Sequence, residues 1–274
     1  MIVFPNCKIN LGLQVLQKRP DGFHDIATVF YPVPLKDALE IVPTENIQQL
    51  SFYNYGLTVH GDPADNLCMK AWRLLKKDFP GLPFVQIHLL KNIPMGAGLG
   101  GGSADGAFML KLLNDKFHLG LREEQLLYYA LQLGSDCPFF VVNKPCYATG
   151  RGELMETIAI DLSGYQLVLV NPGIHVHTGQ AFTRLDMNNA LAKTGFVKEA
   201  VMQPVTTWKQ QLFNDFEGPV FEQYPEIKSV KENLYKLGAV YASMSGSGSV
   251  VFGLFNTAIN LTSGLPVHYT VIQL

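Results

Sequence analysis

Charged residues are scarce in this chain of 274 residues. It has 21 Lys and Arg and 23 Asp and Glu, so charged side chains make up 16% of the sequence and the net charge is −2. An average globular protein has roughly 25% charged residues. Because basic residues are not in excess, we expect no binding along a nucleic-acid backbone. A local basic pocket for one nucleotide is still compatible with this composition.

Long apolar runs and metal-binding cysteine patterns are also missing. No run approaches 18 uninterrupted apolar residues, so we expect no transmembrane helix and no membrane partner. The first residues do not follow the charged-then-apolar pattern of a signal peptide, which favours a cytoplasmic protein. No C-x-x-C pair or histidine cluster occurs around the four cysteines, so we expect reduced, buried thiols at Cys7, Cys68, Cys137 and Cys146.

Hydrophobic residues are abundant, at 47%, and their periodicity predicts an α+β fold. In the first half we expect strands at 7–17, 25–33, 38–42, 50–54 and 84–90, helices at 103–117 and 123–133, and a hairpin of strands 138–142 and 146–149. In the second half we expect strands at 165–170, 239–243, 250–255 and 267–273, and helices at 178–185, 188–194, 204–213 and 225–237. A break near 155–164 predicts two domains, 1–158 and 159–274.

A dense run of glycines lies between a predicted strand and a predicted helix. Five of the seven residues from Gly96 to Gly102 are glycine. Glycine accepts positive φ and lets a ligand approach the backbone without meeting a Cβ atom. Successive backbone N–H groups, together with the positive end of the following helix, form a cradle for phosphate. The run therefore predicts a phosphate-binding loop.

Four kinds of phosphate-binding loop compete for this run. Residues 96–101 fit G-x-G-x-x-G, but no acidic residue on a strand end follows about 20 residues later, as a dinucleotide site requires. No Gly-Lys pair occurs anywhere in the chain, so a P-loop is close to excluded. The glycine loop of protein kinases joins two strands, whereas this run opens a helix.

The fourth kind of loop is indicated by several motifs that occur in order along the chain. They are Cys7-Lys8-Ile9-Asn10-Leu11, Asp21-Gly22-Phe23-His24, Pro94-Met95-Gly96-Ala97-Gly98-Leu99-Gly100-Gly101-Gly102-Ser103, Gly134-Ser135-Asp136-Cys137-Pro138-Phe139 and Ser245-Gly246-Ser247-Gly248. In order and spacing from about residue 5 to 255, the chain resembles the GHMP kinases, and among them those that phosphorylate a cytidine-diphosphate-linked sugar alcohol. The resemblance implies the two-domain fold of that family, with an N-terminal ribosomal-protein-S5-like domain and a C-terminal ferredoxin-like domain.

The resemblance also implies ATP and Mg²⁺ as cofactors, bound by the glycine loop. The expected nucleotide-binding residues are Pro94, Met95, Gly96, Ala97, Gly98, Leu99, Gly100, Gly101, Gly102, Ser103, Ala104 and, near the adenosine, Asn66. Ser103 can equally cap the helix, and Asn66 beside Asp65 can equally start one. The metal ligands stay unassigned.

Two residues are the expected catalytic pair. Asp136 matches the family's aspartate that takes the proton of the substrate hydroxyl, and Lys8 is expected beside it, where an ammonium keeps a carboxylate ionised. From composition alone, Asp136 is a turn or cap residue and Lys8 a solvated one. Lys8 and Asn10 alternate with the apolar Cys7 and Ile9, so both should lie on one face of their strand.

The expected substrate-binding residues are Asn10, Phe23, His24, Thr178 and Phe182. In the family an aromatic and a histidine of the Asp-Gly-Tyr-His motif stack on the cytosine and read its edge. Here Phe23 replaces the tyrosine, which keeps the stacking surface but loses the hydroxyl. Phe182 matches the second stacking aromatic, although without the resemblance it is a core residue.

Four functions remain in competition. The first is phosphorylation of a cytidine-diphosphate-linked sugar alcohol in the non-mevalonate route to isoprenoid precursors, by a monomer or weak homodimer. The others are another GHMP kinase such as homoserine kinase, a dinucleotide-dependent oxidoreductase, and a catalytically silent relative. Two base-stacking aromatics, Phe23 and Phe182, argue against a small amino-alcohol substrate. The presence of both Lys8 and Asp136 argues against a silent relative.

Overall fold

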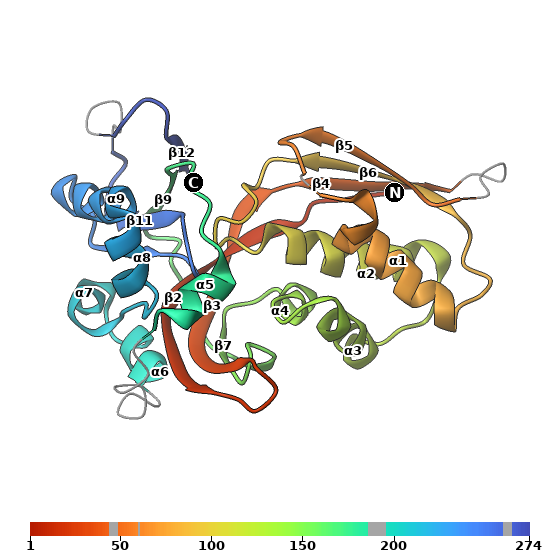
Figure 1. Cartoon of the computed structure of the whole chain (residues 1–274), viewed down its shortest axis with the longest axis horizontal. Coiled ribbons are helices and arrows are strands. Elements are labelled where there is room, and N and C mark those ends of the chain that lie inside the picture. The colour runs from red at the N-terminus through yellow and green to blue at the C-terminus, as the bar shows by residue number, and fades with distance from the viewer. Residues whose placement is uncertain (44–48, 60, 186–195, 260–264) are drawn as a thin grey trace. The chain divides into compact units, whose positions relative to one another are not determined.

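A computed structural model describes residues 1–43, 49–59, 61–185, 196–259 and 265–274 (Figure 1). The chain forms two compact units, neither of which is one continuous stretch. Unit 1 comprises Met1–Cys7, Pro32–Met95 and Gly100–Lys144. Unit 2 comprises Lys8–Tyr31, Gly96–Leu99 and Pro145–Leu274.

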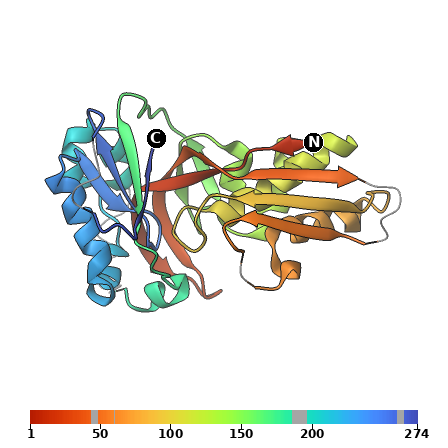
Figure 2. The same cartoon turned by 90° about the horizontal axis from the view of Figure 1, so that it is seen from above.

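Unit 1 is built on a four-stranded sheet of order β1-β4-β6-β5, formed by β1 (Ile2–Val3), β4 (Ala38–Pro43), β6 (Val85–Lys91) and β5 (Ser51–Gly56). Strand β4 pairs antiparallel with β1 and β6, and β5 pairs parallel with β6. Helices α1 (Leu67–Asp78) and α2 (Gly101–Phe117) lie against one face (Figure 1). Figure 2 looks onto the opposite face. The alternation of buried and more exposed residues along β6 follows from this one-sided cover.

Helices α3 (Glu123–Leu133) and α4 (Cys137–Val142) follow α2 in this unit. A short 3₁₀ turn, η1 (Pro63–Asp65), precedes α1. The strand predicted at 138–142 is wrong, because these residues form α4. A run of Phe and Val suits a buried strand and a buried helix equally, and Pro138 in the first turn decides for the helix. The predicted strand at 146–149 is β7 (Cys146–Thr149), and its hairpin partner is the following strand, β8 (Leu154–Thr157).

Unit 2 contains an antiparallel sheet of order β10-β11-β9-β12. Its strands are β9 (Gln166–Asn171), β10 (Tyr241–Met244), β11 (Val251–Phe255) and β12 (Thr270–Gln273). Helices α8 (Glu217–Gln223) and α9 (Pro225–Lys236) pack on it and bury an aliphatic core that includes Val220, Ile227, Val230 and Leu234. The second half of the chain thus builds its own hydrophobic core.

A second sheet of order β2-β3-β7-β8 uses the two longest strands, β2 (Asn6–Lys18) and β3 (His24–Lys36), whose residues are shared between the units. The remaining helical elements of unit 2 are α5 (Thr178–Thr183), α6 (Phe196–Val201), η3 (Val205–Thr207) and α7 (Trp208–Gln211). The helix predicted at 188–194 lies outside the described residues. The mixture of helices and mainly antiparallel sheets confirms the predicted α+β class.

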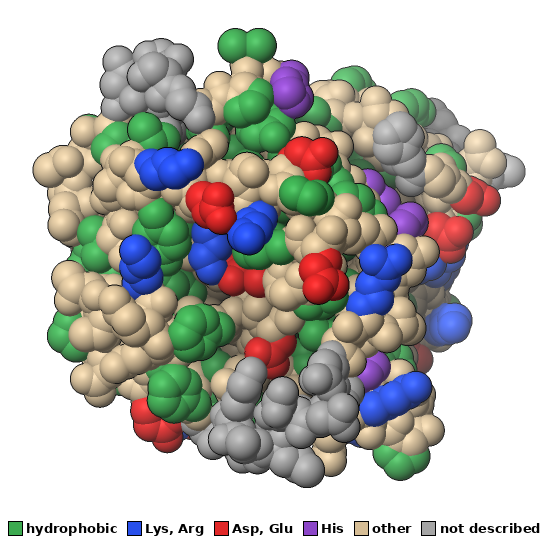
Figure 3. Space-filling model, turned by 60° about the vertical axis from the view of Figure 1, so that its left-hand side comes forward, with side chains coloured by type: hydrophobic (Ala, Val, Ile, Leu, Met, Phe, Trp, Pro, Cys, Tyr) green, Lys and Arg blue, Asp and Glu red, His purple; other side chains and the backbone are tan. Residues whose placement is uncertain are grey.

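None of the four cysteines forms a disulfide, and all four are buried, as their spacing predicts. Within the described ranges, no helix combines the length and the hydrophobicity needed to cross a bilayer. On the face drawn in Figure 3, Lys and Arg side chains lie among Asp and Glu side chains, so both signs of charge are interspersed there.

Candidate active site

The first half of the glycine loop is fitted against a second glycine loop of unit 2. Gly98 has φ +79°, and a Cβ atom there would lie 1.9 Å from the backbone oxygen of Ser245. The Ser245 hydroxyl donates a hydrogen bond of 2.8 Å to the Gly98 carbonyl, and the Val250 amide donates one of 3.1 Å to the Ala97 carbonyl. A side chain at position 98 is therefore excluded by both the backbone conformation and the close approach.

Lys8 is fixed directly on this loop. Its side chain is only 3% exposed, which excludes the solvated-face interpretation. The ammonium donates hydrogen bonds of 2.7 Å to the Asn10 side-chain oxygen and 3.0 Å to the Gly98 carbonyl, and the Lys8 amide donates to the Leu99 carbonyl. Asn10 in turn donates to the Thr28 hydroxyl at 2.9 Å. Alternate positions of β2 thus bring a buried cation to the carbonyl edge of the loop.

The second glycine loop is held by a buried polar network. Asn214 donates from its amide to the carbonyls of Met244 and Gly246, both at 2.8 Å. Glu217 accepts from the Ser243 hydroxyl and the Met244 amide with one oxygen, and from the Lys231 ammonium at 2.6 Å with the other. Because the buried groups of this network pair with one another, the loop that packs on Gly98 has a defined shape.

The second half of the glycine loop begins helix α2 in unit 1. Gly100 is the N-cap, with φ +69°, and no side chain caps the helix. The first N–H groups of a helix lack intrahelical partners and carry the positive end of its dipole. The amides of Gly101, Gly102 and Ser103 therefore suit a phosphate group. Ser103 lies in the first turn, and its predicted alternative role as N-cap is wrong, because Gly100 occupies that position.

Asp136 lies at the N-terminus of α4 in the same unit. It is the N-cap residue by position, but its carboxylate makes no capping hydrogen bond, and it is half-buried. The next residue, Cys137, hydrogen-bonds the Ser103 side chain; burial raises the pKa of the Cys137 thiol to about 12, and the charge of Asp136 adds to the shift. Ser103 and Asp136 therefore share Cys137 as a neighbour. Lys8 belongs to the other unit, so its pairing with Asp136 stays a prediction.

A buried ionic cluster beneath the loop was missed by sequence reasoning. Lys91, at the end of β6, donates to the carboxylates of Asp37 and, at 2.7 Å, Asp105, and all three side chains are almost fully buried. Burial raises the pKa of Asp105 to about 8 against the opposing effect of the Lys91 charge. The cluster lies under the start of α2, since a Cβ atom at Gly101 would lie 3.0 Å from the Lys91 nitrogen.

This cluster ties the two ends of the loop together. Asp37 also accepts from the amides of Asn92 and Ile93, which precede the loop, while Asp105 belongs to the helix that follows it. The signal was present in the sequence, because Lys91 continues the buried positions 85, 87 and 89 of β6. A lysine on the buried face of a strand indicates a buried ion pair.

The expected base-binding residues of unit 2 lie partly together. The ring of His24 stacks on that of Phe182, with centroids 4.4 Å apart, and Phe182 meets Phe216 edge to face. Phe23 is 49% exposed, and the Arg151 guanidinium lies 4.1 Å from its ring centre. Burial, with a smaller effect of the Lys18 charge, lowers the pKa of His24. His24 is therefore neutral at pH 7 and can both donate and accept a hydrogen bond.

Two further predicted residues have structural contacts. The Thr178 hydroxyl lies 2.8 Å from the Ser247 hydroxyl of the second glycine loop. The Asn66 side chain accepts the Cys68 amide and caps α1, so the structural interpretation of Asn66 is confirmed. Pro94 and Ala104 are buried and Met95 is exposed. Among the residues that the structure describes, no group of three or more His, Cys, Asp or Glu could hold a metal ion.

Comparison with known families defines the class of protein. The family model of the GHMP kinase N-terminal domain matches residues 66–144, and that of the GHMP kinase C-terminal domain matches residues 200–264. These segments fall on either side of the predicted boundary at residues 158/159, which stays a prediction. Together with the α+β fold and the glycine loop at the start of α2, these two matches show that the chain is an ATP-dependent small-molecule kinase of the GHMP class.

Relatives narrow the class further. The chain is 52% identical over 263 residues to the 4-diphosphocytidyl-2-C-methyl-D-erythritol kinase of Bacteroides fragilis strain YCH46, covering 96% of this chain and 94% of that one. It is 38% identical to the enzyme of the same name from Solidesulfovibrio magneticus, covering 94% and 90%. A crystal structure of 4-(cytidine 5'-diphospho)-2C-methyl-D-erythritol kinase superposes with a TM-score of 0.75 at 31% identity, covering 93% and 90%. The chain therefore belongs to the 4-diphosphocytidyl-2-C-methyl-D-erythritol kinases of the GHMP kinase family.

Proposed function

We propose that this chain transfers the γ-phosphoryl group of ATP to the 2-hydroxyl of 4-diphosphocytidyl-2-C-methyl-D-erythritol, a step of the non-mevalonate isoprenoid route. The observation that carries the proposal is the 52% identity to a kinase of that name along nearly the full length of both chains. The loop supports the same reaction, because its uncapped helix amides and the missing Cβ at Gly98 suit a triphosphate.

ATP binding is assigned to the loop from Pro94 to Ala104, with Asn66 near the adenosine. The amides at the start of α2 bind phosphate oxygens, and Ser103 offers its hydroxyl to phosphate or to the metal. Mg²⁺ suits this arrangement, because it usually takes one or two protein oxygens and completes its shell with phosphate and water. When bound, Mg²⁺ neutralises charge on the transferring phosphoryl group.

The phosphoryl transfer is assigned to Lys8 and Asp136. The substrate 2-hydroxyl oxygen forms a bond to the γ-phosphorus, the bond from that phosphorus to the β,γ-bridging oxygen breaks, and ADP leaves. The hydroxyl proton passes to the Asp136 carboxylate, which lies at the N-terminus of α4. The Lys8 ammonium, held at the Gly98 carbonyl, stabilises negative charge near the reacting oxygens.

Recognition of cytosine is assigned to Phe23, His24 and Phe182. Phe182 and His24 already present parallel rings, and a neutral imidazole can read both donors and acceptors on the base edge. Asn10 and Thr178 supply further polar contacts to the substrate. We expect a cytoplasmic enzyme that is a monomer or weak homodimer, which light scattering would test.

A coupled ADP-release assay tests the proposal. The protein, ATP and Mg²⁺ are incubated with 4-diphosphocytidyl-2-C-methyl-D-erythritol, with homoserine in a parallel reaction, and with ATP alone. We expect ADP release that depends on the cytidine substrate and on Mg²⁺. Release with homoserine but not with the cytidine substrate would refute the assignment.

A further inference from the structure

An exposed histidine covers the first glycine of the phosphate loop. A Cβ atom at Gly96 would lie 2.6 Å from two ring atoms of His175, so the imidazole rests directly on the Gly96 backbone. Gly96 has φ +63° and is exposed, and His175 is exposed as well. Both residues belong to unit 2. The ring therefore lies at the open surface of the loop and is not packed in the core.

The segment that carries His175 is anchored at both ends. The Ser249 hydroxyl donates to the Ile174 carbonyl, and the Thr178 hydroxyl pairs with Ser247, so the second glycine loop holds residues 174 and 178. Between them, Val176 is 5% exposed and belongs to the core of unit 2. In extended chain, neighbouring side chains point to opposite sides, so a buried Val176 directs both flanking histidines outward.

The second histidine supports the first. The rings of His175 and His177 meet edge to face, with centroids 4.6 Å apart. Burial of hydrophobic surface does not explain the pair, because both side chains are exposed. An imidazole offers at least one N–H donor in either protonation state, which suits a phosphate oxygen. The pair thus places N–H donors beside the loop to which the proposed function assigns ATP.

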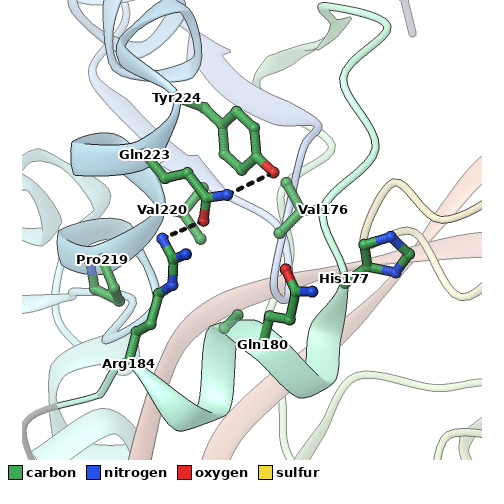
Figure 4. Close-up of a pocket in the computed structure, with 9 residues that line it drawn as sticks. Val176, His177, Gln180, Arg184, Pro219, Val220, Gln223 and Tyr224 are labelled. Atoms are coloured by element: carbon green, nitrogen blue, oxygen red, sulfur yellow. Dashed lines mark hydrogen bonds between the residues drawn. The ribbon is translucent and has the colours of Figure 1, made fainter.

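A neighbouring hollow does not compete for this role. It lies between α5 and α8, where Arg184 donates to the Gln223 side-chain oxygen and Gln223 donates to the Tyr224 hydroxyl (Figure 4). The Arg184, Gln223 and Tyr224 side chains thus pair with one another. Figure 4 shows the His177 ring directed away from Gln223 and Tyr224. His177 is among the residues that line this hollow, but its ring is not directed at the paired groups.

We propose that His175 is a phosphate-contacting residue of this site, held in place by His177, and that its ring N–H donates to a phosphate oxygen bound at the Gly96 end of the loop. The proposal rests on the proposed function, which names ATP and the cytidine substrate as the ligands. Two sources carry the required chemistry: the triphosphate of ATP and the diphosphate of the cytidine substrate. Gly96 belongs to the loop, whereas Thr178 is an expected contact of the cytidine substrate, so the position of His175 suits either source.

Calorimetric titration of His175→Ala and His175→Gln tests the proposal. Each variant and the wild type are titrated with a non-hydrolysable ATP analogue, with ADP and with the cytidine substrate. A hydrogen bond to a charged group contributes about 1.5 kcal/mol or more, which corresponds to a change of about tenfold in Kd. His268→Ala is the matched control, because it also removes an exposed imidazole of unit 2 but lies outside the loop segments.

The expected result is that His175→Ala weakens one phosphate ligand about tenfold, while His175→Gln, which retains an N–H donor, recovers part of that loss. A loss for the ATP analogue larger than that for ADP assigns the contact to the γ-phosphate. A loss confined to the cytidine substrate assigns it to that diphosphate. Affinities within about twofold for all three ligands would overturn the proposal, as would a lower melting temperature as the sole change. Failure of the proposed function is distinguishable, because it appears as a wild type without turnover of the cytidine substrate.

Discussion

The Gly98→Ala substitution is the most stringent test of the close packing between the two glycine loops. The new Cβ atom would lie 1.9 Å from the Ser245 backbone oxygen, well inside normal contact distance, and the residue would keep a φ of +79°. Either the loop moves away from Ser245, or Ser245 moves away from the loop. In both cases the Gly98 carbonyl, which accepts from Lys8 and Ser245, leaves its position.

The expected cost follows from two contributions. A non-glycine residue in the left-handed region costs roughly 1–2 kcal/mol. Loss of a hydrogen bond to the charged Lys8 side chain costs a further ~1.5–3 kcal/mol. The free energy of unfolding should therefore fall by about 2.5–5 kcal/mol, a large part of the ~5–15 kcal/mol that stabilises a typical domain.

Urea denaturation and ATP titration measure the two consequences of Gly98→Ala. Gly218→Ala is the matched control, because Gly218 is exposed in α8, its φ is not positive and a Cβ atom there meets no atom within 4 Å. We expect Gly218→Ala to change stability by no more than about 1 kcal/mol. If Gly98→Ala matched the control in stability and bound ATP like the wild type, the close fit of the two loops would be refuted.

Three further predictions concern single side chains. Asp136→Ala should bind ATP normally while kcat in the ADP-release assay falls about 10²–10⁴-fold; near-normal turnover would remove Asp136 from the mechanism. His24→Ala should raise KM for the cytidine substrate and leave KM for ATP unchanged, whereas equal losses for both substrates would indicate misfolding. Because burial lowers the pKa of His24, the wild-type KM should rise only at a pH below the usual pKa of histidine. The pKa of Asp105 is raised to about 8, so the folded protein holds this proton more tightly than the unfolded chain does. The resulting stabilisation is fully present below the unfolded pKa of Asp105 and is lost as pH rises toward 8. Asp105→Asn should flatten that decline in urea midpoints, and an unchanged decline would show that another group causes it.

Much of the fold could be predicted from periodicity. The strand at 84–90 and the helix at 123–133 correspond to β6 and α3, because the alternation of β6 and the Gln125 side chain that accepts the Arg122 amide at the start of α3 are local signals. The error at 138–142 arose because a short apolar run has no decisive period. A helix–helix contact was equally invisible: at Gly106 a Cβ atom would lie 2.9 Å from Leu67, so glycine there permits close packing of α1 on α2.

Sequence reasoning proposed site residues mainly where they lie in a motif. Lys8, Asp136 and His24 each belong to one of the ordered motifs. Lys91 and His175 belong to none of these motifs. Their relevance comes from contacts with residues that are not their neighbours in the sequence. No local pattern shows that the His175 ring rests on Gly96 or that the Lys91 ammonium lies under Gly101. Such contacts are products of tertiary structure.

Selective ¹⁵N labelling of glycine followed by titration with Mg-ATP tests most directly whether bare loop amides bind the nucleotide. The chain contains 25 glycines, of which five lie between Gly96 and Gly102. Our account predicts that the amide resonances of these five shift most on addition of ATP. Saturating ATP that shifts glycines elsewhere while leaving these five unchanged would contradict it.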